Sequence, residues 1–202
     1  MPVACFDVDS VLTDYLKGFH GFMVTKGYNP IKHPCGSQLL NWSMECTYPQ
    51  LNDDKIIESI IEYSQSDLYK NMEFIPGAKE AVNNLIYKNP NWDFIALTAA
   101  GTDPDVIKTR KEMIKDFPFS EVIVIGERDP KLQHYKDLKV DLVVEDHVKN
   151  GLAALEVGAA LAIFDYPYNR GIKSHVRFNN WDDGQVQIQN ILDGNIPNLK
   201  SA

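Results

Sequence analysis

Five short apolar runs constrain the fold of this 202-residue chain more than any other feature. The runs cover residues 3–6, 93–97, 121–125, 141–144 and 160–164. Val, Ile, Leu and Phe fill them with little polar alternation, which is typical of strands that are covered on both faces. Amphipathic stretches between most of the runs predict helices at 77–88, 104–115, 130–138 and 148–157. This alternation predicts an α/β fold, a doubly wound, Rossmann-like parallel sheet of five strands.

The segment 15–73 is too long for an ordinary crossover and contains no convincing core strand. An amphipathic helix is predicted near residues 53–66, and its apolar face contains Ile56, Ile57, Ile60 and Ile61. Because long structureless loops are uncommon in compact domains, we expect a small helical cap inserted after the first strand. The expected division is an α/β core of residues 1–14 and 74–202 and a cap of residues 15–73. The alternative is a helical appendage that only pads the core.

The first apolar run leads into Asp-Val-Asp-Ser-Val-Leu-Thr-Asp at residues 7–14. On an extended strand, the side chains of Asp7 and Asp9 share one face. Two buried carboxylates side by side are costly without a partner, and a hard cation with a phosphate ester would supply one. Open parallel sheets bind ligands at the carboxyl ends of their strands, where this pair is expected. The sequence therefore points to phosphoryl chemistry, and the alternative is an acidic turn that merely ends a strand.

Three other predicted strands also end in residues that suit a phosphate site. Thr98 and Ala99 follow the second run, where a hydroxyl and backbone N–H groups suit phosphate oxygens. Lys131 comes just after the third run, and its point charge suits a phosphoryl oxygen beside carboxylates. Glu145 and Asp146 follow the fourth run. Parallel strands have their carboxyl ends at one edge of the sheet, so we expect these residues to converge, although each alone also fits a solvated turn.

Together these residues resemble the haloacid dehalogenase (HAD) superfamily of phosphotransferases. Residues 7–14 match its first motif, D-x-D-G-(T/V)-L-x-D, except that Ser10 stands where glycine is usual. Thr98 matches the second motif, Lys131 the third, and residues 141–146 the fourth, D-x3-(D/E)-D. The four motifs occur in the expected order across residues 3–164. The long insertion after the first motif is similar to that superfamily's helical cap.

The resemblance implies a role for each motif residue. Asp7 is expected to attack phosphorus and form an aspartyl-phosphate, while Asp9 protonates the leaving oxygen and then activates water. Mg²⁺ is the implied cofactor, held by the Asp7 carboxylate, the Asp9 backbone carbonyl and Asp146, with Glu145 acting through water. The residues expected to hold the phosphoryl oxygens are Thr98, Ala99 and Lys131.

A narrower resemblance is to the 5′(3′)-deoxyribonucleotidase branch of that superfamily. Residues 74–78 look like its Pro-Gly-Ala helix start, and residues 164–170 with 176–181 look like its C-terminal P-Y-N-R…R-x-x-x-W signature. The alternative for this tail is a packing arm. The implied substrate is a nucleoside or deoxynucleoside monophosphate. Two departures bear on that assignment, Ser10 in the first motif and Ala99-Ala100 where the branch often has Ser-Pro.

Aromatic residues of the expected cap are candidates for recognition of the leaving group. Phe19, Phe22 and Trp42 are predicted to stack on a base, because flat apolar faces suit a π-system and tolerate several bases. The alternative is that these three side chains are part of the cap's own core.

The composition excludes several classes of partner. A net charge of −8 and a pI near 5.1 argue against a nucleic-acid polymer, whose phosphate backbone favours basic surfaces. No apolar run approaches 18 residues, and Met1-Pro2 leads directly into the first run, so neither a membrane span nor a signal peptide is expected. Three scattered cysteines do not indicate a disulfide framework or a zinc site. A cytoplasmic protein with a small-molecule substrate is expected, and the resemblance suggests a homodimer.

Two other functions remain open at this point. One keeps the chemistry and changes the substrate to a sugar phosphate or another small phosphomonoester. The other is a non-catalytic binding module of the HAD fold, which the unusual Ser10 keeps open. A receiver-type phospho-acceptor has a related architecture, but the cap-sized insertion and the acidic pair after the fourth strand argue against it.

Overall fold

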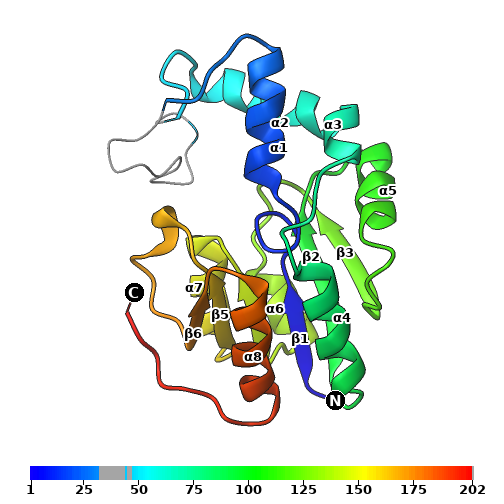
Figure 1. Cartoon of the computed structure of the whole chain (residues 1–202), viewed down its shortest axis with the longest axis vertical. Coiled ribbons are helices and arrows are strands. Elements are labelled where there is room, and N and C mark those ends of the chain that lie inside the picture. Colours follow the sequence, from blue (N-terminus) through cyan, green and yellow to red (C-terminus); the bar gives the residue numbers. More distant parts are fainter. Residues whose placement is uncertain (32–43, 45–46, 202) are drawn as a thin grey trace.

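The computed structural model describes residues 1–31, 44 and 47–201. Its centre is a sheet of six parallel strands in the order β3-β2-β1-β4-β5-β6, with helices on both faces (Figure 1). The strands are β1 (Val3–Phe6), β2 (Asp93–Ala99), β3 (Glu121–Ile125), β4 (Leu142–Glu145), β5 (Ala160–Phe164) and β6 (Val176–Phe178). The doubly wound, Rossmann-like class predicted from the apolar runs is therefore confirmed.

The sheet contains one strand more than the five that the sequence predicts. The additional strand, β6, is only three residues long and pairs in parallel with β5 at the edge of the sheet. Its middle residue, Arg177, is half-buried and polar, so the segment does not form an apolar run. A strand this short carries no periodicity that a sequence pattern can reveal.

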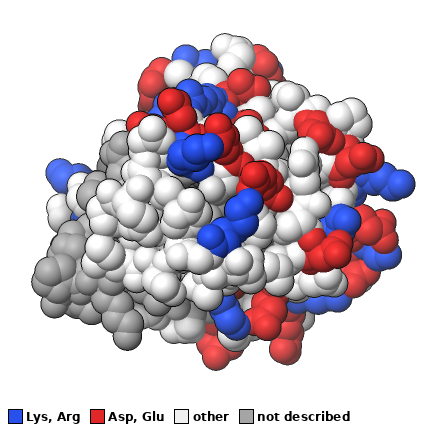
Figure 2. Space-filling view, turned by 90° about the horizontal axis from the view of Figure 1, so that it is seen from above, with Lys and Arg blue, Asp and Glu red and all other residues white. Residues whose placement is uncertain are grey.

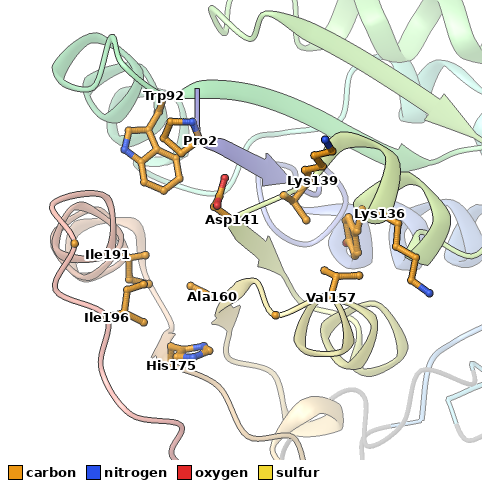
Figure 3. A pocket seen from close by; sticks show the side chains of 14 residues that line it. Pro2, Trp92, Lys136, Lys139, Asp141, Val157, Ala160, His175, Ile191 and Ile196 are labelled. Atoms are coloured by element: carbon orange, nitrogen blue, oxygen red, sulfur yellow. The ribbon is translucent and has the colours of Figure 1, made fainter.

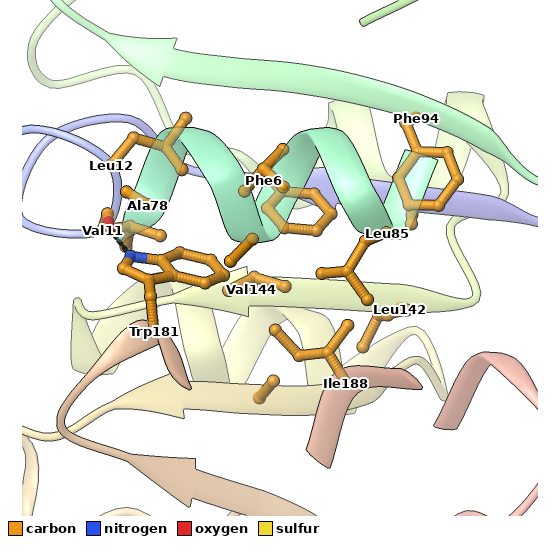
Figure 4. Packing of buried hydrophobic residues seen from close by; sticks show 14 of the residues in the cluster. Phe6, Val11, Leu12, Ala78, Leu85, Phe94, Leu142, Val144, Trp181 and Ile188 are labelled. Carbon is orange, nitrogen blue, oxygen red and sulfur yellow. Dashed lines mark hydrogen bonds between the residues drawn. The ribbon is translucent and has the colours of Figure 1, made fainter. Parts of the chain in front are cut away.

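Five helices cover the two faces of the sheet. They are α4 (Ala78–Lys88), α5 (Pro104–Met113), α6 (Leu132–Leu138), α7 (Val148–Glu156) and α8 (Trp181–Leu192). Neighbouring residues of β1 point to opposite faces, as strand geometry requires. Phe6 packs with Trp181 and Ile188 of α8 and with Leu85 of α4 (Figure 4), whereas Cys5 belongs to the cluster that contains residues of α6 and α7. Both faces are thus buried, which explains the continuous apolar character of the strands.

Three of the described helices lie in the segment 15–73 after β1, and we call them the cap helices: α1 (Tyr15–Thr25), α2 (Asp53–Ser64) and α3 (Asp67–Lys70). They stand over the carboxyl ends of the strands (Figure 1) and share a cluster rich in aromatic side chains. The predicted helix near 53–66 is present, capped by Asn52, and it buries Ile56 and Tyr63. The prediction that Ile61 lines the apolar face is wrong, because its side chain is 42% exposed.

Two chain segments join the cap helices to the sheet, and they run side by side. Thr13 and Phe74 form an antiparallel bridge. The Asp14 N–H donates to the Glu73 carbonyl at 2.8 Å, and the Ile75 N–H donates to the Leu12 carbonyl at 2.8 Å. Both connections are therefore fixed to each other directly below the cap helices.

Acidic and basic residues are interspersed on the described surface seen from above the cap helices, without a continuous positive field (Figure 2). In the part of the chain that the structure describes, no helix is both long and apolar enough to cross a membrane.

Candidate active site

The strand order places the acidic residues at the centre of the sheet. β1 lies between β2 and β4, so the residues after these three strands meet at one edge, where open α/β sheets bind ligands. A cavity of about 410 Å³ lies there between the sheet and the cap helices. Its lower wall includes Asp7, Asp9, Lys131 and Asp146, and its upper wall includes Tyr15, Ile60 and Tyr69.

A second cavity, of about 700 Å³, lies at the opposite edge of the sheet (Figure 3). Its walls include Trp92, Asp141 and His175, which precede β2, β4 and β6. Asp141 is the first acid of the fourth motif, yet its carboxylate accepts a hydrogen bond from the Val3 N–H at 2.8 Å and is separated from the other acids by the length of β4. The smaller cavity is therefore the one that contains the motif residues.

The loop after β1 is held in a defined conformation. The N–H groups of Leu12 and Thr13 donate to the Val8 carbonyl at 2.8 and 3.0 Å. The indole N–H of Trp181 donates to the Val11 carbonyl at 2.9 Å from below the loop (Figure 4). Ser10 has a φ of +59°, a left-handed conformation that glycine adopts at little cost. This backbone requirement explains physically why the first motif usually has glycine at this position.

Lys131 joins two of the predicted acids. Its ammonium contacts Asp7 at 2.8 Å and Glu145 at 2.7 Å, and all three side chains are nearly or fully buried. The Asp7 carboxylate accepts the lysine and the Val8 N–H on the same oxygen, Oδ1. Within the described residues these are its polar contacts, so Oδ2 is the oxygen available to a ligand.

The second acid pair is fixed by many hydrogen bonds. Both oxygens of Glu145 are occupied: Oε1 accepts from Lys131 and Asn150, and Oε2 accepts from the N–H groups of Asp146 and His147. The Asp146 carboxylate accepts one hydrogen bond from the Tyr168 hydroxyl, and Asn169 donates to the Asp146 carbonyl at 2.8 Å. Tyr168 and Asn169 come from the C-terminal P-Y-N-R segment, which thus contacts the site in addition to packing.

The proximity of the three carboxylates, Asp7, Glu145 and Asp146, shifts their pKa values. Burial, together with the charge of Glu145, raises the pKa of Asp7 to about 7 despite the neighbouring Lys131. Burial and the charges of Glu145 and Asp7 likewise raise the pKa of Asp146 well above its ordinary value. Burial also opposes ionisation of Glu145, but the Lys131 ammonium and the hydrogen bonds to its oxygens lower the pKa of that residue. An additional cation would relieve the repulsion among the three carboxylates.

Asp7, Glu145 and Asp146 are the described acids that fit such a cation, since one oxygen from each lies within 4.8 Å of the others. Carboxylate oxygens are the ligands that Mg²⁺ prefers in proteins. Because both oxygens of Glu145 are already occupied, Asp7 and Asp146 are better placed for direct contact. This arrangement agrees with an indirect role for Glu145.

Asp9 has a partner that the sequence did not indicate. Arg110, on α5, contacts Asp9 Oδ2 at 2.7 Å, and its side chain is fully buried. The two residues are 101 positions apart, and Arg110 belongs to none of the four motifs. A basic residue in the middle of an amphipathic helix normally lies on its solvent face, so the sequence pattern contained no signal for this contact.

Thr98 is buried at the end of β2, and its hydroxyl has no hydrogen-bond partner among the described residues. A buried hydroxyl without a partner is unfavourable, and a phosphoryl oxygen would satisfy it. Ala99 lines the cavity beside it. The next two N–H groups, of Ala100 and Gly101, both donate to the Ile125 carbonyl and are not available to a phosphate.

The predicted base-stacking residues lie in different places. Phe19 and Phe22 are buried in the aromatic cluster of the cap helices and do not line the cavity. Trp42 lies outside the described residues. The aromatic side chains that do line the cavity are Tyr15 and Tyr69, from α1 and α3. Sequence alone could not separate these tyrosines from the other aromatic residues of the segment.

A Rossmann-like sheet with these motif residues at its carboxyl edge and helices inserted after β1 defines a hydrolase of the HAD superfamily. Similar solved structures include a HAD-superfamily hydrolase of subfamily IA from Geobacter sulfurreducens, with a TM-score of 0.57, 16% identity and coverage of 96% of each chain. A hydrolase from Pseudomonas syringae has a TM-score of 0.60 and 15% identity, with coverage of 96% of this chain and 99% of the other. A magnesium-bound HAD-hydrolase from Bacillus subtilis has a TM-score of 0.59 and 13% identity, with coverage of 95% and 98%.

The particular family is given by the sequence itself. The family model of the "5′ nucleotidase, deoxy (Pyrimidine), cytosolic type C protein" (NT5C) matches residues 1–192, and the chain belongs to this family. No curated protein matches the chain in sequence. The chain is thus an enzyme of the phosphatase class, as the four motifs predicted, and the non-catalytic module is not supported.

Proposed function

We propose that this enzyme hydrolyses nucleoside or deoxynucleoside monophosphates in a Mg²⁺-dependent reaction that passes through a phosphorylated Asp7. The observation that carries the proposal is the buried cluster of Asp7, Lys131, Glu145 and Asp146 at the floor of a cavity with aromatic walls. Membership of a 5′ nucleotidase family supports the substrate class.

The residues present fit a magnesium ion. The carboxylates of Asp7 and Asp146 and the Asp9 carbonyl would hold it, and the unpaired Thr98 hydroxyl suits the phosphate beside it. When bound, Mg²⁺ would neutralise charge on the carboxylates and on the phosphoryl group. The similar HAD-hydrolase from Bacillus subtilis is bound to magnesium, which supports the same cofactor here.

The remaining steps belong to the side chains of this chain. Asp7 Oδ2 attacks phosphorus while the ester oxygen leaves with a proton from Asp9. Water then attacks phosphorus and gives its proton to Asp9, which restores Asp7 and releases phosphate. Lys131 and Thr98 stabilise the phosphoryl oxygens as charge moves to the leaving group.

The cap supplies recognition of the leaving group. We propose the domain division of residues 1–14 and 74–202 as core and 15–73 as cap, because the two connecting segments pair at residues 12–14 and 73–75. Tyr15 and Tyr69 line the cavity, and their aromatic rings suit contact with a nucleobase better than contact with a sugar alone. These two tyrosines replace Phe19 and Phe22 as our candidates for contact with the base.

The substrate class is tested by measuring phosphate release from nucleoside and deoxynucleoside monophosphates beside sugar phosphates, each with Mg²⁺ and with EDTA. We expect metal-dependent release that favours nucleotides. Release that favours sugar phosphates would retain the chemistry and overturn the substrate. Release that persists in EDTA would overturn the cofactor.

The nucleophile is tested by the conservative change Asp7→Asn, which keeps the size of the side chain and removes its negative charge. We expect turnover to fall by about 1,000-fold or more, because the attacking oxygen is lost. Asp116→Asn, an exposed residue paired with Lys79, is the matched control and is expected to retain full activity. Substantial turnover by the folded Asp7→Asn enzyme would refute the assignment.

The family description includes the word cytosolic, and we propose that the enzyme acts in the cytoplasm on small phosphate esters. The homodimer implied by the resemblance stays a prediction, and light scattering of the purified protein would test it.

A further inference from the structure

Arg110 is a fully buried cation that connects the core to the cap. Its guanidinium donates to Asp9 Oδ2 at 2.7 Å. The same group lies over the ring of Tyr69, with 4.9 Å between Cζ and the ring centroid. Asp9 belongs to the loop after β1, whereas Tyr69 belongs to α3 of the cap helices and lines the cavity. One side chain of α5 therefore contacts both the second acid of the first motif and the cap wall above it.

The buried ion pair of Arg110 and Asp9 is not expected to contribute much to the stability of the fold. A buried ion pair seldom contributes more than well-packed apolar side chains of the same size, because both charges lose their hydration. Arg110 also leaves its Nε buried without a hydrogen-bond partner in the described part of the chain. The presence of Arg110 at this buried position is therefore better explained by its effect on Asp9 than by a contribution to stability.

The contacts of Asp9 determine how its carboxylate is oriented. Arg110 occupies Oδ2, while the Thr13 hydroxyl lies 3.2 Å from Oδ1. That hydroxyl lies equally close, at 3.2 Å, to the Val8 carbonyl. The Thr13 hydroxyl has a single hydrogen, which these two oxygens share, while Arg110 donates to the other oxygen of Asp9. The Asp9 carboxylate is thus contacted on both oxygens, which fixes its orientation.

We propose that Arg110 is a positioning residue, which orients Asp9 for proton transfer to the leaving oxygen and is itself held in place by Tyr69 of the cap. The proposal rests on the proposed phosphatase function. In the step concerned, the bond from phosphorus to the ester oxygen breaks, the bond from Asp7 to phosphorus forms, and the Asp9 proton moves to the ester oxygen. Arg110 does not line the cavity, and it therefore acts through Asp9.

The test compares leaving groups that need a proton with one that does not. The alkyl ester is the best nucleoside monophosphate of the substrate panel or, if none is cleaved, glycerol 2-phosphate. The aryl ester is p-nitrophenyl phosphate, whose leaving group departs readily as an anion. The quantity measured is kcat/KM, because it reports the steps up to departure of the leaving group and excludes hydrolysis of the common phosphorylated enzyme.

For Arg110→Met we expect kcat/KM to fall by about 100-fold or more for the alkyl ester and by less than about 10-fold for the aryl ester, the difference expected when general acid catalysis is lost. Arg110→Lys, which keeps a charge, should recover part of the alkyl-ester activity. Lys108→Met, an exposed change on the same helix, is the matched control and should leave both values unchanged. Equal losses for the two esters, or no loss, would overturn the proposal.

Tyr69 provides a second test that does not alter the buried charge. For this test the alkyl ester is glycerol 2-phosphate, which has no base for Tyr69 to contact. Tyr69→Leu removes the ring face and should lower its kcat/KM by about 5- to 10-fold relative to the aryl ester, in line with the strength of a desolvated cation–π contact. Tyr69→Phe keeps the ring over Arg110 and should recover most of this loss. A Tyr69→Leu enzyme with an unchanged ratio would overturn the part of the proposal that concerns the cap. An unmodified enzyme that cleaves neither ester would instead overturn the proposed function, and the role of Arg110 with it.

Discussion

Ser10 stands in a left-handed backbone conformation, with φ of +59°, inside the loop that carries Asp7 and Asp9. This conformation is unfavourable by about 1 kcal/mol or more for a residue with a Cβ atom, but not for glycine. Its hydroxyl is also buried without a partner among the described residues. The departure from the usual glycine is therefore a cost in stability, and it removes no group that touches the substrate.

We expect Ser10→Gly to stabilise the protein by about 1 kcal/mol, which raises the melting temperature by roughly 2–4 °C in a chain of this size. Lys139→Gly is the matched control, since Lys139 has a similar φ of +52° at the end of α6 and does not line the cavity that contains the motif residues. Both changes should raise the melting temperature, measured by circular dichroism, and leave kcat within about twofold. A lower melting temperature for Ser10→Gly would show that the serine side chain contributes more than its backbone costs.

His20 makes the stability depend on pH. It is buried on α1, with Nδ1 2.6 Å from the Tyr48 hydroxyl, and burial lowers its pKa, partly offset by Asp14. A histidine with a lowered pKa in the folded state binds its proton more readily when the chain is unfolded. The contribution of His20 is thus complete well above an unfolded pKa of about 6.5 and is lost as the pH falls through and below that value.

Accordingly, acidification from pH 7.5 to 5.5 should lower the free energy of unfolding of the unmodified protein, measured in urea, relative to that of the His20→Gln protein. His134→Gln, on α6, serves as the control and should follow the unmodified protein. If the His20→Gln protein loses as much stability on acidification as the unmodified protein, another group is responsible for the pH dependence.

At the scale of elements, the tail after β5 helps to hold the loop that follows β1. Trp181 begins α8, is fully buried, and donates its indole hydrogen to the Val11 carbonyl. Trp181→Phe removes the donor and leaves a buried carbonyl unpaired, which costs about 1–3 kcal/mol. Because Val11 lies between Asp9 and the first cap helix, kcat should fall together with the melting temperature.

The matched control is Trp92→Phe, since Trp92 is half-buried at the opposite edge of the sheet (Figure 3). It should leave kcat unchanged and lower stability less. The role of Trp181 in holding the loop is contradicted if Trp181→Phe melts at a lower temperature but keeps its full kcat at a temperature where it is folded.

The elements that the sequence predicted are those with a regular apolar pattern. The five predicted strands and the helix near 53–66 are present, while α1, α8 and β6 had no comparable signal. The helices α1 and α8 each contain glycine: a Cβ at Gly18 would lie 2.1 Å from the Tyr63 hydroxyl, and one at Gly184 would lie 2.4 Å from the Phe178 ring. Glycine lowers helix propensity, yet tight packing requires it at these two positions. Tertiary contact thus overrides the local pattern.

The residues of the candidate site also fall into those that the sequence predicted and those that depend on tertiary packing. The motif residues lie together because each follows a parallel strand, and the short apolar runs reveal these strands although they do not give their order in the sheet. Arg110 and the wall tyrosines depend on how α5 and the cap helices pack, and no local pattern encodes that packing. Lys131 was foreseen as a phosphate ligand, but its close contact with both Asp7 and Glu145 required the fold.

At the scale of the whole molecule, stability and the metal are coupled through the buried carboxylates. In the folded protein, Asp7, Glu145 and Asp146 lie within reach of one cation, whereas in the unfolded chain Asp7 is far in sequence from the other two. A cation that binds only the folded state stabilises it by RT ln(1 + [L]/Kd), about 2.7 kcal/mol at a hundred times Kd. Lys131 alone does not balance three acids, and a bound cation would remove the repulsion that remains among them.

We therefore expect Mg²⁺ to raise the melting temperature by roughly 5–10 °C at saturation, given 2–4 °C per kcal/mol for a chain of this length, and EDTA to reverse the rise. Asp146→Asn should abolish most of the shift because one ligand charge is lost, while Asp193→Asn, at the exposed end of α8, should keep it. Calcium, which also prefers oxygen ligands, separates binding from turnover, since it should raise the melting temperature even where it supports little activity. A melting temperature that is the same with Mg²⁺, with Ca²⁺ and with EDTA would mean that these carboxylates bind no cation. Lys131 would then be the group that compensates their negative charge.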